Sequence, residues 1–170
     1  MSPYILALTI PSLFYLIPFK INKRTSNFLI IMFCIFLTIF IGLRHHTGGD
    51  WGNHVFHFYK YGALFNPLSF NLRSDYGYEF ISWIIYQFTS NFYLLTFLLA
   101  LLLVYSVYFF LNNRYEKYFI GLLISLPTLF TIYGMGFIRQ GAAISFVFIA
   151  LKFFFEKKIS YFLFFIILAT

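Results

Sequence analysis

Long apolar runs alternate with short polar segments along this chain, and only 10% of its residues are charged. Soluble domains carry about a quarter. Several of the runs approach the ~20 residues that an α-helix needs to cross a bilayer. They cover residues 4–19, 28–43, 92–111, 119–133, 137–155 and 159–170. The pattern predicts an all-α, polytopic membrane protein with about five to six transmembrane helices, forming a single membrane domain over residues 1–170.

The apolar stretch 80–111 is interrupted at Ser90 and Asn91. One straight helix of that length would reach about 48 Å, well beyond the ~30 Å hydrocarbon core of a membrane. A break at the two polar residues leaves a full span over 92–111 and a short segment, 80–89, which would reach about 15 Å as a helix. The short segment is amphipathic, and we expect an interfacial or re-entrant helix there. The polar face of this helix holds Glu79, Ser82, Tyr86 and Ser90.

The net charge of +7 would suggest nucleic-acid binding in a soluble protein. Here most basic residues lie in three short loops, 20–27, 112–118 and 152–158, and no RNA- or DNA-binding pattern accompanies them. The positive-inside rule places these loops in the cytoplasm if segment 80–89 does not cross the membrane. Segment 44–79 is then an extracytoplasmic loop, and nucleic acid is excluded as a partner.

Segment 44–79 holds all four histidines and three of the five acids. Its glycines at 48, 49 and 52 would let the backbone present amides to an anion. An ordinary turn in which Asp50 caps a helix is the alternative. If the next residues are helical, Asp50, His54 and His57 share a face that would be able to hold a metal. No second carboxylate or cysteine lies at ligand spacing, so we predict no metal and expect the histidines to bind lipid headgroups or a substrate.

Arg139 lies at the start of an apolar run, where charged side chains usually face a cavity and mark function. Arginine is also well suited to phosphate, because its planar fork of donors matches the oxygens. The alternative is that Arg139 snorkels to the outer interface. With Arg44 and Arg73 it would place three guanidinium groups on the outer side, which suggests an anionic, lipid-linked substrate. A general base would come from the acids on that side, Asp50, Asp75 and Glu79.

These residues occur in an order that resembles the EpsG-like family of Wzy-type bacterial polysaccharide polymerases. The motifs are Arg44 at a helix end, Gly48-Gly49-Asp50-Trp51, Tyr78-Glu79-Phe80, and Phe137-Ile138-Arg139-Gln140 with Ala143. Each motif is short, and the combination carries the resemblance. Two differences stand out. This chain has His54 where the family often has a tyrosine, and it ends at Thr170, before the His-Ser pair of the family. We therefore expect the 170 residues to be the N-terminal part of a larger protein or the product of a truncated gene.

The resemblance implies a glycosyltransferase at the outer face of the bacterial inner membrane. Such an enzyme transfers a growing glycan from undecaprenyl diphosphate to a lipid-linked repeat unit, forming O antigen, capsule or exopolysaccharide. By this resemblance Arg139 and Arg44 bind the diphosphate, and Asp50 or Glu79 orients or deprotonates the acceptor. The other expected substrate-binding residues are Gly48, Gly49, His54, Arg73 and Gln140. No cofactor, metal or nucleotide sugar is expected. The expected partners are the undecaprenyl-diphosphate-linked glycan, membrane lipids, and the chain-length regulator and flippase of the same pathway.

Three alternatives remain. A ligase would move the glycan to lipid A or to a protein. A transporter or flippase of lipid-linked oligosaccharide would more often show charged residues within several spans, together with inverted repeats. The first four spans have almost no such charges, and no repeat is visible. An inactive remnant is the third.

Overall fold

The computed structural model describes residues 9, 23–48, 50–64, 76–111, 121 and 125–169, and every regular element in this part of the chain is a helix. The expected all-α fold class is therefore confirmed for the described residues. The elements are α2 (Lys23–Gly42), α3 (Trp51–Leu64), α4 (Tyr76–Phe88), α5 (Phe92–Leu111), the π-helix η2 (Leu126–Gly136), α7 (Ile138–Phe155) and α8 (Ile159–Ala169). The expected first span, residues 4–19, and the loop 112–118 lie outside the described residues.

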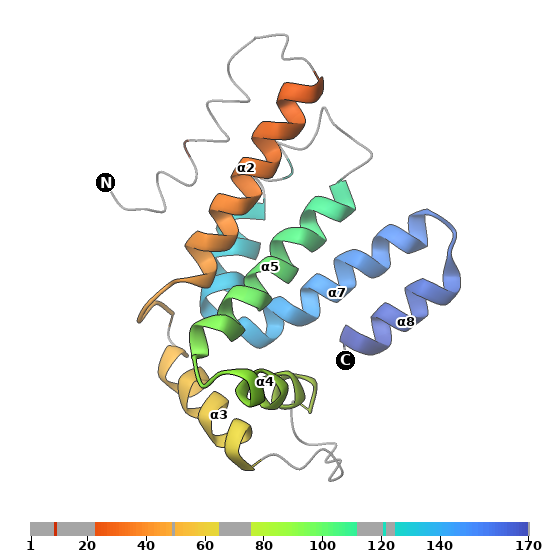
Figure 1. Ribbon diagram of the computed structural model, residues 1–170. Helices are drawn as coiled ribbons and strands as arrows, with labels where there is room; N and C mark the ends of the chain where they lie inside the picture. The colour runs from red at the N-terminus through yellow and green to blue at the C-terminus, as the bar shows by residue number, and fades with distance from the viewer. Residues whose placement is uncertain are drawn as a thin grey trace.

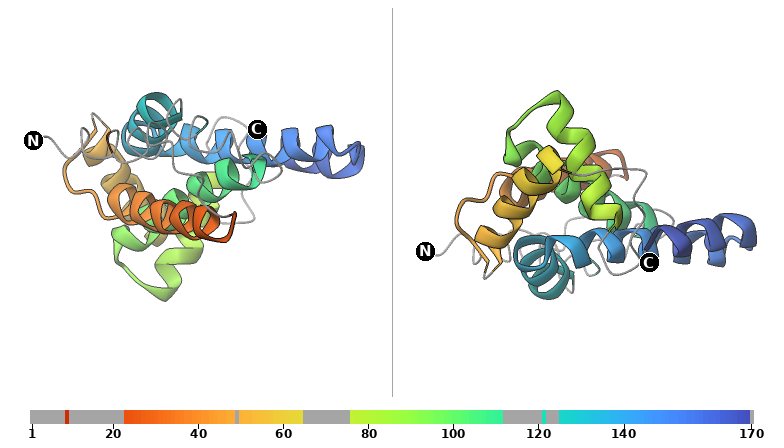
Figure 2. Two further views of the ribbon diagram at one scale, coloured as in Figure 1. Left: turned by 90° about the horizontal axis from the view of Figure 1, so that it is seen from above. Right: turned by 90° about the horizontal axis from the view of Figure 1, so that it is seen from below.

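Helices α2, α5 and α7 form the body of the fold, with α5 packed between the other two (Figure 1). Helix α8 folds back on α7 as a hairpin, which extends away from the remaining helices in both views of Figure 2. Helices α3 and α4 pack against each other at one end of this body, close to the end of α2 and the beginning of α5 (Figure 1). The chain segments with most of the polar chemistry are thus gathered at one end of the bundle.

Two apolar clusters hold these helices together. The first joins α2, α5 and η2 and includes Leu37, Ile41, Leu103, Phe130 and Met135. The second lies under α3 and α4 and connects them to α5 and to the beginning of α7. Its buried members are Trp51, Phe58, Tyr78, Ile85, Phe92, Leu95, Leu99 and Ile138. Because this second cluster contains residues of four helices, it fixes where their polar side chains meet.

Large apolar side chains cover much of the outer surface. Helix α2 exposes a row of them, including Ile31, Ile35 and Ile39, and α8 has no buried residue at all. Soluble monomers rarely expose such continuous apolar patches, whereas lipid-facing surfaces consist of them. Two described helices, Phe92–Leu111 and Ile138–Phe155, are long and apolar enough to cross a membrane, and Asn27–Gly42 and Ile159–Ala169 are shorter apolar helices. These features fit a membrane protein. The number of spans stays a prediction.

The predicted break between 80–89 and 92–111 is present. Helix α4 ends at Phe88 and α5 begins at Phe92. Asn91 caps α5, because its side-chain Oδ1 accepts a hydrogen bond of 2.9 Å from the backbone N–H of Tyr93. The short helix begins at Tyr76 rather than at residue 80, and α3 occupies much of the segment expected to be a polar loop.

The boundary between the predicted runs 119–133 and 137–155 is present, but the first element extends three residues further than expected. Gly134 and Gly136 belong to η2, and the chain turns at Phe137 instead. The N–H of Phe137 donates to the carbonyl oxygen of Ile132, five residues earlier, which is the spacing of a π-helix. The glycines therefore do not end the element as turn residues. They lie in its last, wide turn, which directs the chain into α7.

Candidate functional site

The loop between α2 and α3 positions Arg44. This side chain is only 6% exposed, although it carries a charge. Its Nη1 donates a hydrogen bond to the carbonyl oxygen of Gly134 in η2, and its guanidinium carbon lies 5.8 Å from the centroid of the Trp51 ring. A cavity of about 10 Å³ beside Arg44, Gly134 and Ile138 has room for about one water molecule. Arg44 is therefore held in one place between the loop and the end of η2.

Gly48 fastens the same loop to η2. Its φ of +95° is disfavoured for residues with a side chain, and a Cβ atom at this position would collide with the carbonyl oxygen of Met135. On the other side of the loop, His45 Nδ1 is hydrogen-bonded to the hydroxyl of Tyr93 in α5. The structure thus gives Gly48 a packing role. Gly49 and Arg73, two other expected substrate-binding residues, lie outside the described residues.

Asp50 occupies the N-cap position of α3. Its carbonyl oxygen accepts a hydrogen bond of 3.0 Å from the N–H of His54, and this is the first bond of the helix. An acidic side chain at this position is favoured by the helix dipole. The structure therefore gives Asp50 the capping position that the sequence offered as one alternative. Its partial exposure leaves the side chain reachable from outside.

His54 lies on the face of α3 that packs against α4, with Phe58 and Gly62 further along the same face. The side chain is 2% exposed, and neither ring nitrogen has a hydrogen-bond partner among the described residues. Burial lowers the pKa of His54 to about 4, and the positive charges of Arg139 and Arg44 act in the same direction, while Asp50 opposes them. His54 is therefore neutral at physiological pH.

His57 does not complete a metal site with Asp50 and His54. Its ring stacks on Tyr61 at a centroid distance of 5.2 Å. Within the part of the chain that the structure describes, no three histidine, cysteine or acidic side chains are grouped as metal ligands.

Helix α4 directs its polar face into the protein. Tyr78, Glu79 and Ser82 are buried, with Ser82 fully enclosed, whereas Phe80 and Phe88 are exposed. The hydroxyl groups of Tyr78 and Ser82 make no hydrogen bond of normal geometry among the residues described, although Ser82 lies close enough to Tyr78 to lower the pKa of its hydroxyl. Burial raises the pKa of Tyr78 to about 12, so its hydroxyl stays protonated. Of the four residues predicted to form the polar face, Glu79 and Ser82 are buried, Tyr86 is partly buried and Ser90 is exposed.

Arg139 is the second residue of α7 and is half-buried. Its guanidinium carbon lies 6.0 Å from the centroid of the Tyr78 ring, within the range of a cation–π contact. The Tyr78 ring in turn lies 5.9 Å from the His54 ring. Arg139 lies in the first turn of α7, where the helix dipole adds positive potential. Gln140, the next residue, is exposed.

The structure thus brings together residues of four elements around His54: Arg44, Asp50, Tyr78 and Arg139. Buried Glu79 lies next to Tyr78 in α4. The sequence analysis did not propose Tyr78 or Ser82 as site residues. The signals were present, since Tyr78 belongs to the Tyr78-Glu79-Phe80 motif and Ser82 lies on the polar face of the predicted short helix.

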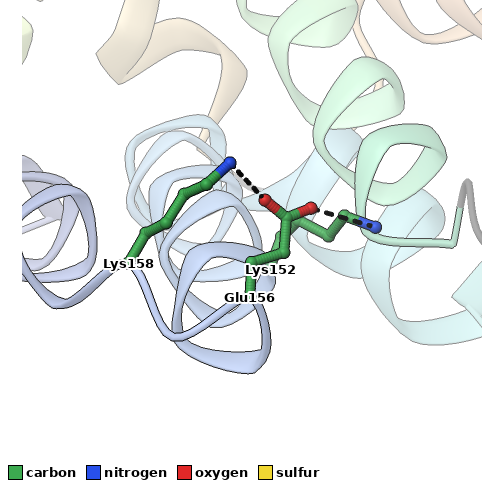
Figure 3. Close-up of polar contacts among 3 residues, drawn as sticks. All are labelled: Lys152, Glu156 and Lys158. Carbon is green, nitrogen blue, oxygen red and sulfur yellow. Dashed lines mark hydrogen bonds and ion pairs between the residues drawn. The ribbon is translucent and has the colours of Figure 1, made fainter.

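The basic residues at the other end of α7 form a separate group. Glu156 lies between two lysines, with its Oε1 3.7 Å from Lys152 Nζ and its Oε2 2.8 Å from Lys158 Nζ (Figure 3). The hydrogen bond from Lys158 lowers the pKa of Glu156. Lys152 is thirteen residues after Arg139, which corresponds to about 20 Å along a helix. The two groups therefore occupy opposite ends of α7, as the predicted topology requires, and the orientation in a membrane stays a prediction.

The model of the EpsG family matches residues 27–170, which include every element described above except the first four residues of α2. The chain belongs to the EpsG family. The resemblance drawn from Arg44, the Gly-Gly-Asp-Trp motif and the Arg139 motif is thereby confirmed. EpsG family membership implies a polymerase-like role in polysaccharide biosynthesis. Neither the search of curated proteins nor the search of solved structures gave a match.

Proposed function

We propose that this EpsG family protein is a membrane glycosyltransferase that joins undecaprenyl-diphosphate-linked repeat units into a surface polysaccharide or exopolysaccharide such as O antigen or capsule. The observation that carries the proposal is the convergence of Arg44 and Arg139 on His54 and Tyr78, although the two arginines lie in different parts of the chain. The reaction would take place at the extracytoplasmic face of the bacterial inner membrane.

The two arginines would bind the diphosphate of the donor. When the bond between the sugar and the diphosphate breaks, negative charge develops on the leaving group, and two nearby guanidinium groups stabilise it. The stabilisation is greater in an enclosed site than in water, because the local dielectric constant is lower. Arg44 is already fixed by Gly134, so it would not have to be ordered when the substrate binds.

The acids would act on the acceptor. Asp50, partly exposed at the N-cap of α3, or the buried Glu79 of α4 would orient or deprotonate the attacking hydroxyl. Gly48, Gly49, His54, Arg73 and Gln140 remain the proposed substrate-binding residues. No cofactor is proposed. Membrane lipids and the chain-length regulator and flippase of the pathway are the proposed partners.

A deletion strain complemented with variants of the complete gene tests this function, with surface polysaccharide displayed as a gel ladder. Arg139→Ala and Arg139→Lys are expected to reduce the ladder to a single-repeat band, the second because lysine keeps the charge but loses the planar fork. Arg24→Lys, at the opposite and exposed end of α2, is the matched control and should keep the full ladder.

An unchanged ladder in the deletion strain would contradict the polymerase function. Absence of even the single-repeat band, with repeat units retained on the cytoplasmic side, would favour a transporter. A free polymer of normal length that fails to reach its final acceptor would favour a ligase.

A further inference from the structure

Three buried polar groups on α3 and α4 make no hydrogen bond of normal geometry among the described residues, although two of them, Tyr78 and Ser82, lie close to each other. They are the His54 ring, the Tyr78 hydroxyl and the Ser82 hydroxyl. Leaving such groups unpaired is costly, and folded proteins do so at few places. Tyr78 and Ser82 share a face of α4, four residues apart, and the His54 ring lies 5.9 Å from the Tyr78 ring. A molecule with several hydroxyl groups, such as a sugar, would satisfy all three.

We infer that His54 is the proton acceptor for the attacking sugar hydroxyl, and that the donor diphosphate held by Arg44 and Arg139 activates it. This inference rests on the proposed function. In the step, the acceptor oxygen forms a bond to the anomeric carbon of the donor glycan. The bond from that carbon to the diphosphate breaks, and its electron pair goes to the diphosphate oxygen. The hydroxyl proton passes to a ring nitrogen of His54, which later releases it to water.

His54 suits this task better than the two acids. Both of its nitrogens are buried and lack a hydrogen-bond partner among the described residues, so a ligand would have to supply one, and the enclosed ring excludes competing water. Asp50 sits half in solvent at the N-cap, where its negative charge favours protonation of the nearby imidazole. Asp50 would therefore stabilise the protonated product of the step.

The ionisable groups around His54 are Asp50 and His57 on α3, Tyr78 with Glu79 beside it on α4, Arg44 in the preceding loop and Arg139 on α7.

The two arginines explain the activation. Without a ligand, the burial of the ring and then the charges of Arg139 and Arg44 lower the pKa of His54 to about 4, which makes it a weak base. A diphosphate carries at least two negative charges and would offset the effect of both guanidinium groups. The pKa of His54 would then rise, and each pKa unit corresponds to about 1.4 kcal/mol in favour of the protonated ring. Deprotonation of the acceptor therefore requires a loaded donor, and the donor must bind first.

The direct test measures the protonation of His54 in the full-length protein. The protein is labelled at histidine Cε1 with ¹³C, and the His54 signal is assigned with the His54→Gln variant. The signal is followed against pH with and without farnesyl diphosphate, a short polyprenyl diphosphate. In the wild type, farnesyl diphosphate is expected to raise the midpoint pH of the His54 titration by at least about one unit. In Arg139→Ala this midpoint should not change when the probe is added.

The outcomes separate the two proposals. If farnesyl diphosphate binds saturably but leaves the His54 midpoint where it was, the inference is overturned while the arginine site stands. If the probe does not bind at all, the proposed diphosphate site itself is wrong.

Activity provides a second test that a purely structural role would not satisfy. His54→Gln keeps hydrogen-bonding groups but cannot take up the proton, so polymer formation should fall at least about 100-fold, with unchanged binding of farnesyl diphosphate. In His54→Ala, added imidazole should restore part of the activity. His46→Asn is the matched control, because His46 is exposed and has a φ of 48°, which asparagine tolerates. A full ladder from His54→Gln would overturn the inference.

Discussion

Arg44 and Gly134 are ninety residues apart in the chain, and a hydrogen bond from Arg44 Nη1 to the Gly134 carbonyl oxygen joins them. The bond connects the loop after α2 to the last turn of η2, one residue before Met135 and close to the beginning of α7. A long, flexible arginine is thereby ordered when the protein folds. The entropy that it would otherwise lose on binding a ligand has already been lost.

The first prediction concerns this bond. In Arg44→Lys the positive charge remains, but an ammonium group cannot contact Gly134 and a phosphate in the planar arrangement of a guanidinium. Loss of one charge-assisted hydrogen bond corresponds to about 1.5–3 kcal/mol, or roughly tenfold to a hundredfold in affinity. The change in affinity is measured by titrating the full-length protein with farnesyl diphosphate. Equal affinity of Arg44→Lys and the wild type would show that the fork is not used.

The second prediction concerns Gly48. Replacing it by alanine forces a side chain into a φ of +95° and against the Met135 carbonyl oxygen. Gly48→Ala should destabilise the fold by about 1–3 kcal/mol. Gly52→Ala is the matched control, since a Cβ there meets nothing within 4 Å and alanine favours the helix. Thermal unfolding in detergent compares the two variants, and equal unfolding temperatures would contradict the packing role of Gly48.

The third prediction is a pH dependence of stability. His54 has an ordinary pKa of 6.5 that the folded state lowers to about 4. Between these values the unfolded chain binds a proton that the folded protein does not, so stability is lost as the pH falls from 6.5 towards 4. From about pH 7.5 to about pH 5 the loss is on the order of 2 kcal/mol. His54→Gln should remove this part of the dependence, and parallel profiles for the two proteins would show that His54 is not the group responsible.

The fourth prediction separates stability from activity at Tyr78. Tyr78→Phe removes a buried hydroxyl that makes no hydrogen bond of normal geometry among the described residues, and it keeps the ring beside Arg139 and His54. Stability should stay equal or rise slightly, by about 1 kcal/mol at most, while the polysaccharide ladder shortens. Tyr105→Phe, on an exposed part of α5, controls for the loss of a tyrosine hydroxyl. A clear drop in the unfolding temperature of Tyr78→Phe would mean that its hydroxyl has a structural partner.

The helices formed by apolar runs could be predicted because their signals are local, whereas α3 lies in a segment expected to be a polar loop. The run 92–111 matches α5, and the break at Ser90 and Asn91 is visible in the sequence because Asn91 provides its own cap. The π-helix could not be predicted in this way. Its hydrogen bonds join residues five apart in the chain, whereas those of an α-helix join residues four apart. The glycines at 134 and 136 are compatible with a π-helix turn and with a loop, so they do not distinguish the two.

The site could be predicted only in part. Arg139 stood out because a charged side chain inside or at the edge of a membrane helix is costly, and Arg44 stood out because it lies on the same predicted side. The role of Gly134 could not be inferred, since a backbone carbonyl is present at every residue and its partner lies ninety positions away. The unpaired hydroxyls of Tyr78 and Ser82 were also hidden. A polar face on a short helix can contact either solvent or a polar protein interior. The sequence does not distinguish these two surroundings, and the packing of α3 against α4 decides between them.

The residues from Tyr133 to Met135 meet their neighbours through main-chain oxygens alone at three points. Arg44 bonds to the oxygen of Gly134, Gly48 lies against that of Met135, and a Cβ on Gly141 would come within 2.8 Å of that of Tyr133. Every amino acid supplies such an oxygen. Among relatives of this protein, these three contacts should therefore restrict positions 44, 48 and 141, but they set no requirement on the side chains of the turn, where the burial of Met135 is a separate constraint.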